Sequence, residues 1–268
     1  MQRNVRAHLE LTLAAPANLV FSLTVAQGAG SGGSALTERL SFRCGGAGVE
    51  PREIVDRHGT RLHQFDAPAG QVTACYEAQV TGGSDPAAVQ PLDLITYLRP
   101  SRYCESDSLL PTAQSEFRGL TGRELLSAVG SWVGDRLSYA PGSSLPTDGA
   151  LRTLLSRRGV CRDYAHLVIA LLRALDVPAR MVAVYAPGLS PMDFHAVAEA
   201  YLDGVWHVVD ATALAPRQSL LRISTGRDAA DTAFLTSHGG NVRLNGMEVE
   251  AVADVLPRDD LREFVQLR

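Results

Sequence analysis

The sequence between residues 159 and 212 decides the fold. It contains GVCRDYAHLVIALLRALDVPARMVAVY at 159–185 and FHAVAEAYLDGVWHVVDAT at 194–212. Apolar residues recur at helical spacing from about 161 to 175, and Pro178 follows them. The β-rich runs that come next predict strands at 179–186, 194–202 and 205–210.

The last two strands are predicted to form a hairpin, because Asp203–Gly204 is a strong signal for a two-residue type I′ turn. Such a turn pairs Leu202 with Val205, and it places His195 and Asp210 on one face of the sheet. Their Cα atoms would then lie roughly 7–8 Å apart, within reach of a carboxylate–imidazole hydrogen bond. His207 would point to the opposite face.

Cys161 is predicted to open the helix, directly after Gly159 and Val160. The unpaired N–H groups and the positive end of the helix dipole favour a thiolate there. Gly159 would give the backbone room for a sharp turn. A lone cysteine at this place is equally consistent with a small packed residue. A histidine and a carboxylate on one nearby sheet face favour the nucleophile, because an oriented imidazole activates a thiol.

Other polar side chains in these segments are expected to be structural. His166 is rotated by about 140° from Cys161 around the helix, so the two are not expected to share a metal. A structural reason is preferred for the following residues: Asp163 at the helix start, Arg227 and Asp228 in a loop or cap, and Trp132 and Tyr139, which could also donate a hydrogen bond to the site.

Outside this stretch the pattern changes twice. Residues 1–105 read as short strands with Gly- and Pro-rich turns, which predicts an antiparallel sandwich-like or barrel-like domain. A linker or short helix at 105–120 leads to helices at 121–137 and 148–157, the first with a capping box of Thr121 and Glu124. We expect a core at 115–235 and a C-terminal strand or hairpin extension at 236–268, with a turn at Asn245–Gly246.

The composition of the 268 residues narrows the class of protein. The net charge of −4 argues against a general nucleic-acid binder. All 25 basic residues are Arg, which excludes P-loop and Schiff-base lysines. We expect no membrane segment and no secretory signal, and therefore a cytoplasmic protein. The cysteines include no CxxC pair, so we expect free thiols, no metal and no cofactor: Cys44, Cys75, Cys104 and Cys161.

The segments YAPGSS at 139–144, GVCRDYAHLVIALLRALDVPARMVAVY and FHAVAEAYLDGVWHVVDAT resemble the bacterial members of the transglutaminase-like superfamily. The resemblance covers about residues 115–235. It implies an α+β fold, in which helices pack on the antiparallel sheet of a papain-like core, preceded by an all-β sandwich-like domain. It also implies that Cys161 is the nucleophile, His195 the base and Asp210 the orienting carboxylate.

Two departures from the family pattern bear on the substrate. The family commonly has HAW where this chain has His195–Ala196–Val197, and DPT where it has Asp210–Ala211–Thr212. Neither change touches the three candidate residues. Both would reshape the cleft beside them, so they put the class of substrate in question.

The expected function is thiol-dependent acyl transfer or hydrolysis of an amide or peptide bond through a thioester. The substrate would be a protein, a peptide or a small amide, and the acceptor is open between water and an amine. The Cys161 backbone N–H would donate to the oxyanion, and the second donor is unassigned. One alternative is a non-catalytic binding or assembly module, against which the intact triad argues. Another is an enzyme like an arylamine acetyltransferase, which the leading β domain fits poorly.

Overall fold

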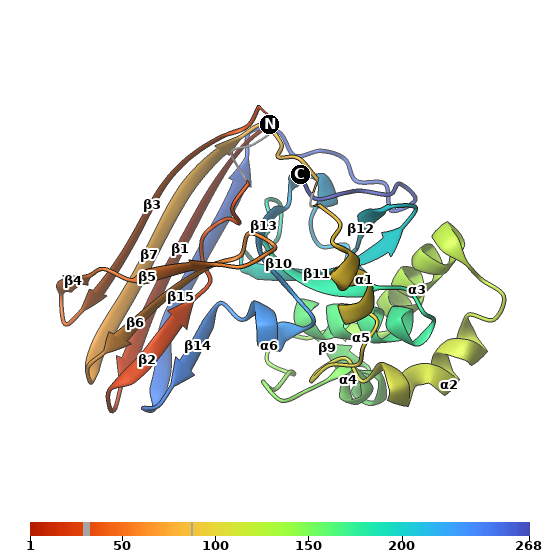
Figure 1. Cartoon of the computed structure of the whole chain (residues 1–268), viewed down its shortest axis with the longest axis horizontal. Coiled ribbons are helices and arrows are strands. Elements are labelled where there is room, and N and C mark those ends of the chain that lie inside the picture. The colour runs from red at the N-terminus through yellow and green to blue at the C-terminus, as the bar shows by residue number, and fades with distance from the viewer. Residues whose placement is uncertain (29–32, 87) are drawn as a thin grey trace.

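Two antiparallel sheets face each other at one end of the molecule, and a third sheet with helices occupies the other end (Figure 1). The computed structural model describes residues 1–28, 33–86 and 88–268. The first sheet has the order β15-β1-β7-β3-β4 and the second β14-β2-β6-β5. Their strands are β1 Gln2–Leu13, β2 Ala17–Phe21, β3 Ala35–Cys44, β4 Ala47–Val49, β5 Arg52–Val55, β6 Arg61–Ala67, β7 Gly70–Thr81, β14 Leu235–His238 and β15 Val242–Ala253.

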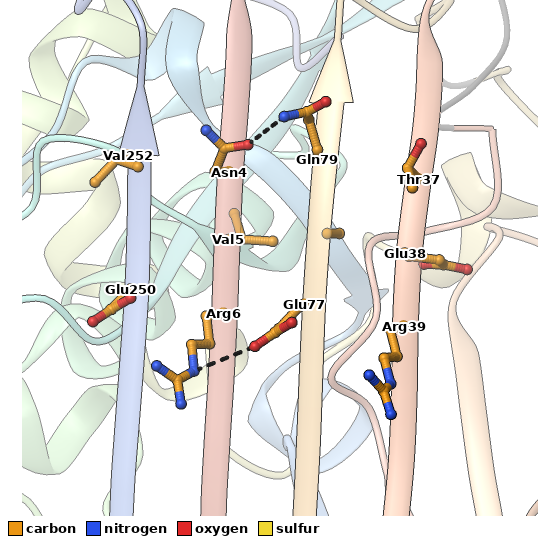
Figure 2. A pocket seen from close by; sticks show the side chains of 11 residues that line it. Asn4, Val5, Arg6, Thr37, Glu38, Arg39, Glu77, Gln79, Glu250 and Val252 are labelled. Carbon is orange, nitrogen blue, oxygen red and sulfur yellow. Dashed lines mark hydrogen bonds and ion pairs between the residues drawn. The ribbon is translucent and has the colours of Figure 1, made fainter.

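Buried and exposed residues alternate along the strands, so the two sheets pack face to face as a sandwich, as the sequence predicted. Along β1 every second residue is buried, from Val5 to Leu13. Between the sheets, the Phe42 ring lies 5.0 Å from Phe21 and 5.1 Å from Phe65. The opposite face of the first sheet is polar, with side chains such as Arg6 and Glu77 around an open hollow of about 390 Å³ (Figure 2).

The C-terminal strand corrects one prediction. Asn245–Gly246 is not a hairpin turn, because β15 continues through these two residues and pairs with β1 from Arg3↔Ala253 to Leu13↔Val242. The register shifts where Glu10 pairs with Gly246 and Leu11 with Leu244, so Asn245 is the extra residue of a β-bulge. A turn-forming pair therefore bends a continuous strand. The predicted boundaries near 105, 115 and 235 stay predictions, but strands from both ends of the chain share this sheet.

The rest of the chain forms the α+β core, whose sheet has the order β12-β11-β10-β13. Its strands are β10 Ala179–Tyr185, β11 Phe194–Leu202, β12 Val205–Val209 and β13 Leu221–Gly226. The helices are α1 Pro91–Thr96, α2 Ser106–Glu116, α3 Gly122–Arg136, α4 Ala150–Ser156, α5 Cys161–Ala174, α6 Ala229–Thr232 and the short η1 Arg217–Ser219. The short strands β8 Ser138–Tyr139 and β9 Arg158–Gly159 pair in parallel.

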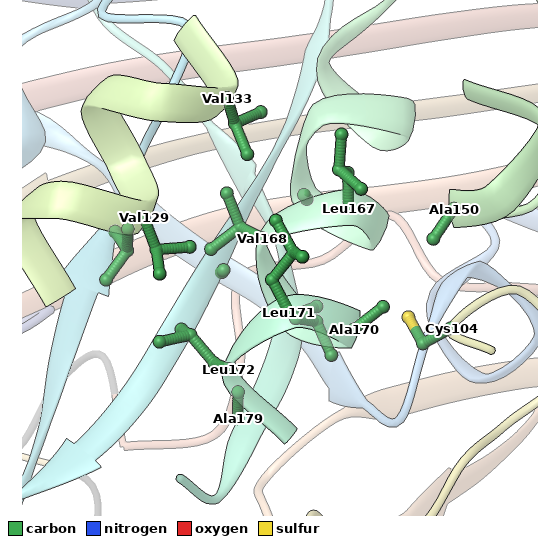
Figure 3. Packing of buried hydrophobic residues seen from close by; sticks show 14 of the residues in the cluster. Cys104, Val129, Val133, Ala150, Leu167, Val168, Ala170, Leu171, Leu172 and Ala179 are labelled. Carbon is green, nitrogen blue, oxygen red and sulfur yellow. The ribbon is translucent and has the colours of Figure 1, made fainter. Parts of the chain in front are cut away.

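Helix α5 is the centre of this core. Its Leu167, Val168, Leu171 and Leu172 are fully buried, and they pack among α3 and the sheet residue Ala179 (Figure 3). A helix that is apolar on nearly all sides is expected at the centre of a fold. Its first residue, Cys161, is consequently held by a rigid element.

The start of α3 differs from the prediction. Thr121 precedes the helix in an extended conformation, but its side chain makes no capping hydrogen bond within the described part of the chain. The predicted capping box with Glu124 is therefore not formed. None of the helices in the described ranges is long and apolar enough to cross a membrane.

Candidate active site

The β11–β12 hairpin brings His195 to Asp210, as its register predicted. Asp203 and Gly204 both have positive φ, 52° and 88°, and Leu202 pairs with Val205. His195 Nε2 lies 3.0 Å from Asp210 Oδ2, and both side chains are buried. The turn chemistry at one end of the hairpin thus sets the contact at the other end.

Asp210 is held through its second oxygen as well. The backbone N–H of Thr212 donates to Oδ1 over 2.9 Å, and the Thr212 hydroxyl donates to the same oxygen over 2.7 Å. Burial raises the pKa of the Asp210 carboxyl, but His195 and Thr212 outweigh that effect and lower it. Asp210 is consequently a fixed carboxylate that orients the His195 ring.

The start of α5 is held by Asp163, whose predicted structural role is confirmed. Asp163 Oδ2 accepts a hydrogen bond from the Val160 backbone N–H over 2.8 Å. Its Oδ1 accepts one from the Ser144 hydroxyl over 2.9 Å. A Cβ atom on residue 159 would come within 2.6 Å of Asp163 Cβ, so this close approach is the reason for Gly159. Together these contacts fix the backbone that carries Cys161.

Cys161 and His195 line the same cleft. His195 Nδ1 has no hydrogen-bond partner within the described ranges, so it is the ring nitrogen available to the thiol. Burial disfavours the imidazolium, but the Asp210 carboxylate and the Cys161 side chain outweigh it and raise the pKa of His195 to about 10. The surroundings thus favour a protonated His195.

Tyr139 also reaches this site, although the sequence favoured a structural role for it over that of a hydrogen-bond donor. Its side chain lies close enough to Cys161 for the two groups to interact electrostatically. Burial and the neighbouring Cys161 raise the pKa of Tyr139 to about 12, so the phenol keeps its proton. The β8–β9 pairing sets this position, because Tyr139 lies opposite Gly159. The sequence offered this position at the site only as the alternative to a structural role.

The other candidate residues lie outside the site. Trp132 donates from Nε1 to Glu116 Oε2 over 2.7 Å. His207 packs edge-on against Phe264. Asp228 caps α6 by accepting from the Ala230 backbone N–H over 2.9 Å, which is a structural role.

His166 is buried within the core instead of facing Cys161. Its Nε2 accepts a hydrogen bond from the Ala229 backbone N–H over 3.1 Å, and its ring stacks on Tyr103. Burial lowers the pKa of His166 to about 3. Among the described residues, no group of three or more His, Cys, Asp or Glu side chains could hold a metal ion.

Comparisons with known proteins agree with this architecture. Residues 113–211 match the family described as the transglutaminase-like superfamily. The solved structure of a proposed cysteine protease from Cytophaga hutchinsonii superposes with a TM-score of 0.87 at 31% identity, covering 99% of this chain and 96% of that one. The match therefore includes the β-sandwich.

Curated relatives match over shorter stretches. The Mycobacterium leprae protein ML0607 is 29% identical over 125 residues, which are 42% of this chain and 43% of that protein. Rv2569c of Mycobacterium tuberculosis is 39% identical over 62 residues, which are 23% of this chain and 20% of that protein. The chain thus spans less than half the length of either relative. Since the whole-chain similarity and the family match both fall on the fold described above, the chain belongs to the transglutaminase-like superfamily.

Proposed function

We propose that this protein is a cysteine peptidase or amidase, which cleaves amide bonds through an acyl-thioester on Cys161. The observation that carries the proposal is the buried His195–Asp210 pair. His195 Nδ1 has no hydrogen-bond partner among the described residues, and His195 shares a cleft with a cysteine at the start of a helix. An acid–imidazole–thiol arrangement of this kind activates a sulfur nucleophile.

The proposed chemistry has two steps. The Cys161 thiolate attacks the amide carbonyl carbon and forms a C–S bond. The C–N bond then breaks, and the amine leaves with the proton that His195 gives it. Water next attacks the thioester while His195 takes its proton, and the carboxylic acid leaves as the C–S bond breaks. Asp210 stays ionised and stabilises the imidazolium throughout.

Two groups support the developing oxyanion in this proposal. The Cys161 backbone N–H belongs to the first turn of α5, where such groups lack helical partners. The Tyr139 hydroxyl keeps its proton because its pKa is raised to about 12. Because it also lies close to Cys161, we propose it as the second donor.

The acceptor and the location are part of the proposal. Water makes the enzyme a hydrolase, and an amine makes it a transglutaminase-like acyltransferase. We propose water as the acceptor and a protein, peptide or small amide as the substrate, with neither nucleic acid nor membrane as a partner. We also propose a cytoplasmic location, which the free state of Cys44, Cys75, Cys104 and Cys161 supports.

The test uses a library of peptides that carry a fluorogenic aminocoumarin amide. We expect the wild type to release the fluorophore and the Cys161→Ala variant to release none, while a Cys75→Ala variant matches the wild type. Added hydroxylamine reports the acyl-thioester, because it releases the acyl group as a hydroxamate, and the product formed without it, free acid or an amide with an added primary amine, identifies the acceptor. If acetyl-coenzyme A instead acetylates Cys161, the acetyltransferase alternative is correct. If Cys161→Ala retains full activity, the proposal is wrong.

A further inference from the structure

The cleft beside Cys161 lies between the start of α5 and the β-sandwich, with a volume of about 360 Å³. Both bodies pack on the core sheet: α5 packs with Met181 and Ala198, whereas the sandwich packs with Tyr185 and Leu221. The cleft therefore lies over the core sheet, with the start of α5 on one side and the β-sandwich on the other. Its volume lies in the range of small-molecule and side-chain pockets.

The lining of the cleft is mainly apolar. The strands β10, β11 and β13 contribute Met181, Ala183, Ala196 and Ile223. Small side chains at 183 and 196 leave space above the sheet, whereas Met181 and Ile223 offer apolar surface. Such a surface binds an apolar group better than a charged one, because the charge would lose its hydration there.

The sandwich side adds its own contacts to the cleft. Phe234 lies between α6 and β14, Leu235 is the first residue of β14, and Met247 comes from β15. In β15, Met247 pairs with Leu9 of β1, so the sheet pairing fixes its position. A residue far from Cys161 in sequence thus forms part of the wall opposite the catalytic helix.

Ser22 is the polar exception on this wall. It is 2% exposed, and its Oγ has no hydrogen-bond partner among the described residues. Its backbone N–H donates to the Phe234 carbonyl over 3.0 Å, which fixes the residue at the end of β2. A buried hydroxyl without a partner is costly, so a polar group of a bound molecule would gain from meeting it.

We propose that this cleft binds the apolar side chain of a peptide, and that the Ser22 hydroxyl bonds a neighbouring peptide group of the same substrate. This inference rests on the proposed function and narrows its substrate to a peptide with a large apolar residue near the scissile bond. The core then supplies the chemistry, and the sandwich supplies the selectivity.

The test uses dipeptide vinyl sulfones, which the Cys161 thiolate attacks at the vinyl carbon while His195 returns a proton to the resulting carbanion. The side chain at each peptide position is varied in turn among Leu, Phe, Gly and Asp. Mass spectrometry gives the rate of Cys161 modification, and each rate is divided by the rate with iodoacetamide. We expect Leu or Phe to exceed Asp by about tenfold or more at one position.

Variants locate the effect on the sandwich wall. Met247→Ala should reduce the Leu-to-Asp ratio by about fivefold or more. Leu244→Ala, at a residue of the same strand that is 42% exposed and does not line the cleft, should leave the ratio unchanged. Ser22→Ala should slow the dipeptide probes but not an alkyl vinyl sulfone that lacks peptide groups. Met247→Leu and thermal melting show whether a loss comes from the contact or from unfolding.

The outcomes separate this inference from the proposed function. Equal rates for Leu and Asp probes, with normal iodoacetamide labelling that depends on His195, would overturn the specificity and leave the nucleophile in place. The specificity is overturned in the same way if Met247→Ala and Ser22→Ala behave as the wild type. If neither iodoacetamide nor any probe labels Cys161, the proposed function fails, and this inference fails with it.

Discussion

A set of Cys, His and carboxylate side chains on the sandwich contrasts with the set in the core, and their difference shows what the proposed catalytic site requires. On the outer face of the sandwich, His8 Nδ1 lies 3.0 Å from Cys75 Sγ, and His8 Nε2 lies 3.3 Å from Glu10 Oε1. In the core, His195 bonds Asp210 beside Cys161. Both sets combine a thiol, an imidazole and a carboxylate, so the contrast lies mainly in their surroundings.

Exposure is the first difference between the two sets. The His8 and Glu10 side chains are 27% and 55% exposed, whereas His195 and Asp210 are 0% and 1% exposed. Water screens the outer pair, and such surface pairs hold their geometry weakly. The inner pair lies in a medium where a carboxylate acts strongly on an imidazole.

The backbone is the second difference. Cys75 lies within β7, paired with His8 on one side and Ser41 on the other, so the ladders occupy the backbone around it. Cys161 opens α5, where the first N–H groups have no helical acceptor. Of these two cysteines, therefore, only Cys161 has a nearby backbone N–H that is available to an oxyanion.

The largest expected effect comes from removing the imidazole of each set. His195→Ala should lower kcat/KM for a peptide amide by about 10³-fold, since general acid–base catalysis contributes 10²–10⁴-fold. His8→Ala should leave kcat/KM unchanged, because His8 contacts Cys75 on the outer face of the sandwich and takes no part in the chemistry at Cys161. Steady-state assays of both variants check this. Equal losses in the two variants would remove the distinction between the sets.

The next effect comes from the carboxylates. Asp210→Asn should lower kcat by about 10²-fold, because the ring loses the charge that stabilises its imidazolium form. Glu10→Gln is the matched control and should have wild-type kcat. The readout is the dependence of kcat on pH. On the alkaline side, kcat of Asp210→Asn should begin to fall at a lower pH than kcat of the wild type. An unchanged profile would show that Asp210 does not act on His195.

Tyr139 has no counterpart near Cys75 in the part of the chain described here. Tyr139→Phe should lower kcat by about tenfold with little change in KM, which is less than the 10²–10³-fold loss typical of removing an oxyanion donor. Tyr164→Phe is the control, since its ring lies 6.0 Å from that of Tyr139. A rise in KM alone would instead place Tyr139 in substrate binding.

The smallest expected effect is on stability. The pKa of His195 is raised from 6.5 to about 10, so its pairing stabilises the fold fully below pH 6.5 and less as the pH rises through 10. The Tm difference between wild type and His195→Gln should therefore be largest near pH 6 and shrink towards pH 10. His8→Gln should change the unfolding free energy by about 0.5 kcal/mol or less. If the Tm difference between wild type and His195→Gln instead increased with pH, the stabilising His195–Asp210 pair would be contradicted.

The sequence predicted the inner set because every step was local. Asp203–Gly204 determines the turn, the turn determines the register, and the register brings His195 and Asp210 to one face. The helix that begins at Cys161 is likewise specified by its own apolar spacing and by Pro178. Predictions of this kind hold in the structure because residues close in sequence provide the contacts on which they depend.

Features that depend on distant segments were missed. The pairing of β15 with β1 joins residues that lie more than two hundred positions apart, and the turn signal at Asn245–Gly246 became a bulge. Ser22 and Met247 reach the cleft only because the sandwich packs beside α5. Tyr139 was named as a possible donor but not preferred, because the short β8–β9 pair that brings it to Cys161 has no periodic pattern of its own.

Alkylation with iodoacetamide across pH, followed by peptide mass spectrometry, tests the central claim most directly. We predict that Cys161 reacts fastest of the four cysteines at pH 6, where an ordinary thiol holds little thiolate, and that His195→Ala abolishes this advantage. His8→Ala should not affect it. If Cys161 reacts no faster than Cys75, and His195→Ala changes nothing, then the inner set is no more activated than the outer one, and the catalytic assignment is wrong.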